Sequence, residues 1–119
     1  MALKLNLGCG RKYLPGYVNC DVLPDVRADL HFDLNSFPYP LESGCADEIL
    51  LDNVLEHLDD IPRVMAELHR LLANRGRLRI LVPYGKSDWA LQDPTHKHCF
   101  TEQSMNYFLE GDPYNFYST

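Results

Sequence analysis

The sequence predicts an α/β fold: an open, mostly parallel sheet of about five to six strands with flanking helices. Short apolar runs of strand length recur along the chain and alternate with crossover segments, which is the pattern of a parallel sheet. One segment has the apolar periodicity of an amphipathic helix. The chain has 119 residues, of which 45% are hydrophobic, so we expect a single domain over residues 1–119 with a modest core.

The first three strands are expected before residue 35. Leu3–Leu7 is a short apolar run, and Tyr17–Val22 is the second strand. Between them, residues 11–16 are too few and too interrupted by Pro15 for more than one helical turn. Ala28–Leu34 alternates apolar and polar residues and is the expected third strand, with Asp33 at its end.

The next elements are a strand, a helix and a strand. Ala46–Asp52 contains a short apolar run typical of buried parallel strands. A helix is expected to follow, capped by Asp59 or Asp60 and ended by Gly76 in a left-handed conformation. One face of this helix carries six apolar residues: Ile61, Val64, Met65, Leu68, Leu71 and Leu72. A fifth strand is expected at 78–82, and a last helix at about 101–109.

The most informative motif ends the first strand, where Leu7 runs directly into Gly8-Cys9-Gly10, with Asp21 following. Glycines at a strand end let the backbone turn sharply and let a ligand approach closely. An acid that ends the neighbouring strand can accept hydrogen bonds from a ribose diol. Together, the turn and the acid predict a nucleoside pocket.

The spacing within this motif disfavours a dinucleotide. A dinucleotide fingerprint has a third glycine, where this chain has Tyr13, and an acid about 20 residues further on. Asp21 comes only eleven residues after Gly10, and no Walker-type G-K-[ST] sequence is present. A turn with little phosphate chemistry suits a nucleoside without phosphates, of which S-adenosylmethionine is the commonest.

Three segments together resemble the class I (Rossmann-like) S-adenosylmethionine-dependent methyltransferases: Asn6–Gly10 (NLGCG), Gly16–Asp21 (GYVNCD) and Asp52–His57 (DNVLEH). The resemblance is greatest to the small-molecule branch, whose fourth strand ends in a V-L-E-H-type segment. It covers about residues 1–84 and extends more weakly through 93–101. It implies an enzyme that transfers a methyl group from S-adenosylmethionine to a small-molecule acceptor, with a cofactor-binding core at 1–84 and an acceptor lid at 85–119.

The resemblance also implies which residues bind the cofactor. The turn Gly8-Cys9-Gly10 would pass under the methionine part. Asp21 would hold both ribose hydroxyls, and Val22 would pack on the adenine. The alternatives for the glycines and for Asp21 are a tight turn with no ligand and a solvated strand end.

Further cofactor contacts are implied at the ends of the third and fourth strands. Asp33 would accept a hydrogen bond from the adenine amino group, and Leu34 would donate its backbone N–H. Asp52 and Asn53 would lie near the methionine arm. Asn6 stands where the family often has an acid, so the cofactor's amino group would be held differently here. For Asp33 the alternative is ordinary turn chemistry.

His57 is the candidate catalytic residue. Methyl transfer needs a base only when the acceptor is a hydroxyl or a protonated amine, and histidine suits that task near neutral pH. The alternative is that His57 hydrogen-bonds backbone at the entry to the following helix.

We assign no metal site from the sequence. His96 and His98 are spaced i, i+2, so they share a face only in a strand or loop, and a structural zinc site needs four ligands. The remaining ligands would have to come from Asp93 or His57. An acceptor-binding lid fits this segment better, because Tyr84, Trp89, Phe100 and Tyr107 offer aromatic surface. Aromatic core packing is the alternative for these four.

Composition limits the partners. The formal net charge of −6 argues against nucleic-acid binding. The four cysteines lie far apart and form no C-x-x-C pair. The sequence has neither a signal segment nor an apolar run of about 20 residues that could span a membrane. We therefore expect a cytoplasmic protein.

The end of the chain is shorter than the resembled fold requires. That fold has seven strands, the last two forming an antiparallel hairpin, and residues after Gly111 supply one short strand at most. The fifth strand would then be an exposed edge, open to pairing with another chain. We expect a homo-oligomer, which sedimentation at high concentration would detect.

Two other functions compete with a methyltransferase. One is a nucleoside-binding module that retains the cofactor half without turnover. The other is an NAD-dependent oxidoreductase, which the missing third glycine and the early acid disfavour.

Overall fold

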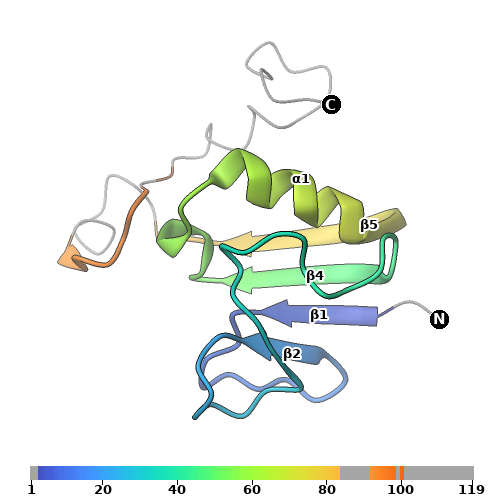
Figure 1. The fold of residues 1–119 in the computed structure, drawn as a ribbon, viewed down its shortest axis with the longest axis horizontal. Helices are drawn as coiled ribbons and strands as arrows, with labels where there is room; N and C mark the ends of the chain where they lie inside the picture. The colour runs from blue at the N-terminus through green and yellow to red at the C-terminus, as the bar shows by residue number, and fades with distance from the viewer. Residues whose placement is uncertain (1–2, 84–91, 99, 101–119) are drawn as a thin grey trace.

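The structure is a computed structural model that describes residues 3–83, 92–98 and 100. Its sheet has five strands in the order β3-β2-β1-β4-β5, and every neighbouring pair is parallel. All carboxyl ends therefore lie at one edge (Figure 1). The predicted open parallel α/β sheet is confirmed, with these strands: β1 Leu3–Leu7, β2 Val18–Asp21, β3 Leu30–His31, β4 Ala46–Asp52 and β5 Leu72–Leu81.

The core lies around the two central strands. Leu5 and Leu7 of β1 and Ile49 and Leu51 of β4 are completely buried. A strand that is flanked by neighbours on both sides and covered on its face loses nearly all contact with water. Burial of such side chains is the main favourable term in folding, so β1 and β4 anchor the sheet.

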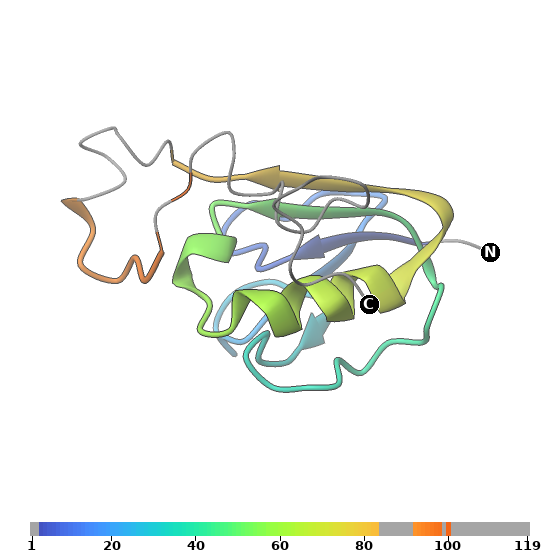
Figure 2. The ribbon, with the colours of Figure 1, turned by 90° about the horizontal axis from the view of Figure 1, so that it is seen from above.

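The expected amphipathic helix is α1, Ile61–Leu71, which packs on one face of the sheet (Figure 2). Val64, Leu68 and Leu71 are fully buried. Asp60 caps the helix, because its carboxylate accepts a hydrogen bond of 3.2 Å from the backbone N–H of Arg63. Of the two predicted caps, the structure therefore selects Asp60.

A partly buried ion pair connects α1 to the loop before β4. The Glu67 carboxylate accepts a hydrogen bond from the Tyr39 backbone N–H at 2.6 Å and pairs with Arg70. The guanidinium of Arg70 also donates to the carbonyl oxygens of Tyr39 and Leu41. The hydrogen bond from Arg70 holds the pKa of Glu67 below its ordinary value, so the pair is charged at neutral pH and its polar atoms are satisfied.

The third strand is much shorter than the sequence predicts, since β3 contains only Leu30 and His31. Two aspartates explain the difference. The Asp29 carboxylate accepts a hydrogen bond from the Asn19 backbone N–H at 2.8 Å. Asp33 accepts one from the Asn35 N–H at 2.8 Å, which turns the chain. Asp33 therefore lies beyond the strand rather than at its end.

The predicted helix end at Gly76 is wrong. The cap residue Leu72 is already extended, with φ −69° and ψ 132°, and β5 begins there. Arg75, not Gly76, has the positive φ, at 66°. The pairing of β4 with β5 shifts register between Ala46 and Glu48, so residues of β5 bulge out. Gly76 is needed because a Cβ there would lie 3.0 Å from the Ala46 carbonyl oxygen.

The segments that connect the strands are loops on one side of the sheet and helical on the other. Residues 8–17 and 22–29 link the first three strands as turns and loops, as the lean spacing predicts. The crossover from β4 to β5 contains the 3₁₀ helix η1, Leu55–His57, followed by α1. Within the described ranges, β5 pairs only with β4, and self-association through this edge stays a prediction.

Some expectations fall on other parts of the chain. The predicted helix at 101–109, the lid aromatics Tyr84, Trp89 and Tyr107, and most of the lid at 85–119 lie outside the described residues. Over the residues that the structure does describe, there is no helix with the length and hydropathy that crossing a bilayer requires.

Candidate functional site

Three consecutive backbone N–H groups of the glycine turn after β1 donate hydrogen bonds to the end of β2. The N–H groups of Gly8 and Cys9 both donate to the Cys20 carbonyl oxygen, at 2.8 and 2.9 Å. The Gly10 N–H donates to Asp21 Oδ2 at 2.8 Å. Anion-binding turns present successive free N–H groups to a phosphate. This turn has already used all three within the protein.

The two glycines of the turn are required for different reasons. Both have positive φ, 74° at Gly8 and 52° at Gly10. A Cβ on Gly8 would lie 2.6 Å from Cγ2 of Val54, so Gly8 makes room for the segment that follows β4. A Cβ on Gly10 would meet nothing within 4 Å. The space beside Gly10 is therefore the open part of the turn, where a ligand can approach.

Two buried asparagines support the turn from below. Asn6 is 2% exposed and donates from Nδ2 to Asn19 Oδ1 at 2.8 Å and to the Lys12 carbonyl oxygen at 2.9 Å. Asn19 is completely buried, and it accepts from the Leu14 N–H and donates to the Leu14 carbonyl oxygen. These bonds hold residues 11–16 in a loop without a helix. The Nδ2 group of Asn6 is thus engaged within the protein rather than directed at the strand edge.

Asp21 retains capacity to bind a ligand. Besides Gly10, its carboxylate accepts a hydrogen bond from the Leu23 N–H at 2.9 Å, through Oδ1. An ionised carboxylate has about four acceptor positions, so two remain. Val22 and Leu23 follow it with 55% and 56% of their surface exposed. A half-buried acid beside two exposed apolar side chains can accept hydrogen bonds from a diol while a flat ring attached to it packs on the apolar side chains.

Asp33 and Leu34 lie next along this edge. The Phe32 backbone N–H donates to the Asp21 carbonyl oxygen at 3.2 Å, which places the following residue, Asp33, close to the end of β2. The Asp33 side chain is exposed and engaged in its turn with Asn35. The Leu34 side chain is buried in the core, so only its backbone can serve a ligand.

Asp52 and Asn53 close the other side of the turn. Asp52 Oδ2 forms an ion pair of 3.1 Å with Lys12 Nζ, and its Oδ1 accepts from Asn53 Nδ2 at 3.0 Å. Asn53 has φ 56°, a conformation that asparagine tolerates better than most residues. The end of β4 is therefore joined to the loop after Gly10. Together with Asp21, these contacts gather the predicted residues of β1, β2 and β4 at one edge of the sheet.

The cysteines near the turn are not activated nucleophiles. Burial, and secondarily the negative charge of Asp21, raise the pKa of the Cys9 thiol. Burial raises the pKa of Cys20 to about 12. A thiol must ionise to attack or to bind a metal, so both cysteines act as small packing residues at neutral pH.

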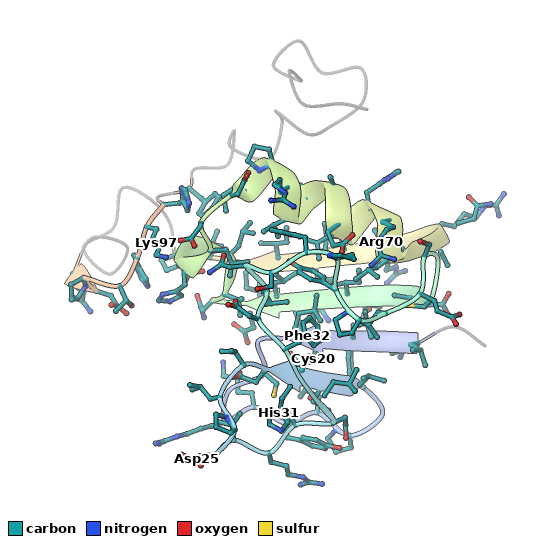
Figure 3. All side chains as sticks on the ribbon, in the orientation of Figure 1. Cys20, Asp25, His31, Phe32, Arg70 and Lys97 are labelled. Carbon is teal, nitrogen blue, oxygen red and sulfur yellow. The ribbon has the colours of Figure 1, made fainter. Side chains whose placement is uncertain are left out.

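A second polar cluster lies at the carboxyl end of β4, where residues 92–98 dock on η1. The Glu56 carbonyl oxygen accepts from the backbone N–H groups of Lys97 and His98, at 2.7 and 3.2 Å. The rings of His57 and His96 meet edge to face, with centroids 4.7 Å apart. In Figure 3, Lys97 and Arg70 mark opposite ends of α1, and the cluster lies at the Lys97 end.

Sequence reasoning missed two residues of these sites, Asn19 and Glu56. Asn19 carries a sequence signal, because it is a polar residue inside the otherwise apolar run Val18-Asn19-Cys20 of β2, whereas Glu56 lies between Leu55 and the polar His57 and carries no such signal. Both side chains are at most 1% exposed. A polar side chain in such a run marks a buried polar contact.

A model of the methyltransferase domain family matches residues 17–80, more than half of the 119 residues. The chain belongs to this methyltransferase family. The match begins just before β2 and runs into β5, so it contains Asp21, η1 and α1. No curated protein matches the chain by sequence.

Two solved structures have a similar fold. A SAM-dependent methyltransferase from Archaeoglobus fulgidus superposes with a TM-score of 0.73 at 19% identity, over 89% of this chain and 57% of that one. The YcgJ protein from Bacillus subtilis gives 0.63 at 18% identity, over 86% of this chain and 57% of its own. At these identities the likeness concerns the fold. This methyltransferase domain spans less than two thirds of either relative.

Replacing Gly8 with alanine should destabilise the protein more than replacing Gly16. Gly16 also has positive φ, 85°, but a Cβ there meets nothing within 4 Å. Both variants incur about 1–2 kcal/mol for a left-handed L-residue, whereas only Gly8→Ala adds about 1–3 kcal/mol of crowding against Val54. Urea unfolding measures the difference. Val54→Ala should be partly compensating in the Gly8→Ala background; equal losses in the two glycine variants would contradict the close approach.

Proposed function

We propose that this chain is an S-adenosylmethionine-dependent methyltransferase that methylates a hydroxyl group of a small-molecule acceptor. The observation that carries the cofactor assignment is the use of three successive N–H groups of the glycine turn by β2. A dinucleotide needs free N–H groups and a helix N-terminus for its pyrophosphate. Here residues 11–17 form turns and loop instead. The turn suits an adenosine that carries no phosphate.

The residues present fit such a cofactor. Open space lies beside Gly10, and two acceptor positions remain on Asp21 for the two hydroxyls of a ribose. The exposed side chain of Val22 offers an apolar surface for adenine. Asp33 and the Leu34 backbone N–H lie next in order for the polar edge of the base. These contacts support binding of the nucleoside half.

The other end of the cofactor would lie toward β4. Asp52 and Asn53 are joined to the turn through Lys12. A zwitterionic amino-acid group needs both a cation and an anion nearby, and the Lys12–Asp52 pair provides both. Asn6 supports this loop from below through its bond to the Lys12 carbonyl oxygen. Its proposed contribution to cofactor binding is therefore made through the loop.

S-adenosylmethionine supplies a methyl group that is already activated by its sulfonium charge. The chain's own task is alignment of the acceptor, and good alignment alone can contribute about 7–11 kcal/mol. The same edge that holds the nucleoside continues through Val54 into η1, where His57 stands. We propose that the small-molecule acceptor binds at this end of the sheet.

His57 is the residue proposed to activate the acceptor. Its Nδ1 lies 3.2 Å from the carbonyl oxygen of Thr95. Nδ1 also lies 3.2 Å from Thr95 Oγ1, whose hydroxyl donates to Asp93 Oδ1. Because the carbonyl oxygen only accepts and the hydroxyl proton is used on Asp93, both contacts favour the proton on Nδ1 and the lone pair on Nε2. In the metal-free protein that lone pair can take a proton from an acceptor hydroxyl.

Calorimetry and methyl transfer test the proposed function in two steps. S-adenosylmethionine and S-adenosylhomocysteine should bind with a measurable Kd, whereas NAD should not. Isotope from labelled methyl should then enter a member of a panel of hydroxyl compounds, sugars included. Binding without transfer would favour a nucleoside-binding module without turnover. Selective binding of NAD would refute the cofactor assignment.

Substituting His57 with alanine should lower kcat at least about 100-fold, which is the usual contribution of a positioned acid or base. The Kd for S-adenosylmethionine should not change, because none of the proposed cofactor contacts is made by His57. His69→Ala, on the exposed surface of α1, is the matched control. A kcat that is equal in both variants would show that His57 has only a structural role.

A further inference from the structure

The Glu56 carboxylate is buried without a hydrogen-bond partner among the described residues. The residue is 1% exposed, and neither Oε1 nor Oε2 has a partner there. Burying an ionised carboxylate costs several kcal/mol unless a charge or hydrogen-bond donors compensate. Each unsatisfied buried group in a native protein therefore needs an explanation, and an ion is one of the ordinary ones.

Two histidines surround this carboxylate. One ligand atom from each of Glu56, His57 and His96 lies within 4.8 Å of the others. His96 Nε2 is 3.8 Å from Glu56 Oε2 and 3.5 Å from Asp93 Oδ2. Hydrogen bonds between charged N–H and O groups are shorter, about 2.7–2.9 Å. Ligand atoms that share a tetrahedral ion at about 2.0–2.2 Å lie about 3.3–3.6 Å apart.

The Asp93 carboxylate is also oriented toward this cluster. Its Oδ1 accepts from the Thr95 backbone N–H at 2.9 Å and from Thr95 Oγ1 at 2.7 Å. Oδ2 is the oxygen that faces His96. A ligating carboxylate is commonly fixed in this way by hydrogen bonds to its other oxygen.

We propose that Glu56, His57 and His96 bind a divalent transition-metal ion, and that Asp93, which lies outside this group of three but faces His96, completes the coordination when the ion binds. Two imidazoles and two carboxylates suit Zn²⁺, whereas Mg²⁺ prefers oxygen ligands alone. The site joins η1 to residues 93–96, and the next two residues, Lys97 and His98, already donate their backbone N–H groups to the Glu56 carbonyl oxygen. The ion would cross-link these two segments at the carboxyl end of β4.

This site differs from the histidine pair that the sequence suggested, to which no metal was assigned. The i, i+2 spacing drew attention to His96 and His98 together. In the structure, Glu56 takes the place of His98 in the cluster. A bound ion would also occupy the lone pair of His57, so proton acceptance by His57 belongs to the metal-free protein only.

The test uses the full chain after removal of metals with EDTA. Calorimetric titration with ZnCl₂ should show one ion per chain, and CoCl₂ should give the visible absorption bands of a four-coordinate site. Glu56→Gln and His96→Ala should each weaken Zn²⁺ binding at least about tenfold. His69→Ala removes an exposed histidine outside the cluster and should bind as the wild type does. MgCl₂ should not compete.

Three results would overturn the proposal: wild-type protein without the cobalt bands, Glu56→Gln binding Zn²⁺ as tightly as His69→Ala, or Mg²⁺ displacing the ion. Circular dichroism shows whether each variant is folded. If Glu56→Gln fails to fold, the proposal is tested on the wild-type protein alone. A rise in its Tm with added ZnCl₂ together with the cobalt bands supports the site, because an ion that binds only the folded chain stabilises it, and the absence of either refutes it.

Discussion

The hydrogen bonding between the glycine turn and the end of β2 is the constraint on which the rest of the site depends. Three N–H groups of the turn are directed at the Cys20 carbonyl oxygen and the Asp21 carboxylate. This arrangement fixes Asp21 beside the open space at Gly10 and removes the donors that a phosphate would need. The hydrogen bonds of the turn backbone therefore favour a ligand without a phosphate group.

The cofactor site and the histidine cluster are connected by very little chain. Val54 contacts the position of Gly8 and directly precedes η1, which carries Glu56 and His57. A displacement of the segment after β4 would alter the glycine turn and the cluster together. The proposed nucleoside site and the proposed acceptor-activating group therefore lie at the same edge of the sheet, as methyl transfer requires.

Regular, strongly patterned elements were predictable from the sequence. Leu3–Leu7 and Ala46–Asp52 are strands with the expected bounds, and the helix begins after Asp60, as its capping chemistry indicates. The third strand and the start of β5 were not predictable, because they depend on which aspartate turns the chain and on a bulge against β4. Local propensity does not report such tertiary partners.

The same limit explains which site residues were found. Gly8, Gly10 and Asp21 form a local motif whose backbone geometry has a sequence signature, so they were identified directly. Asn19 and Glu56 were missed, because their importance lies in burial against residues distant in the sequence. Only the assembled sheet shows that polar side chains at these positions have specific surroundings.

The most direct test of the account is S-adenosylmethionine binding by Asp21→Asn compared with Asp25→Asn, an exposed aspartate in the loop that follows β2. Asparagine can still accept the Gly10 N–H through its single oxygen, so the turn keeps this hydrogen bond, whereas the charge, half of the acceptor capacity and the bond from the Leu23 N–H are lost. Charge-assisted hydrogen bonds contribute about 1.5–3 kcal/mol each. Calorimetry should show a Kd that is about 10–100-fold weaker for Asp21→Asn and unchanged for Asp25→Asn. Equal affinities in the two variants would contradict the assignment of Asp21 to the ribose.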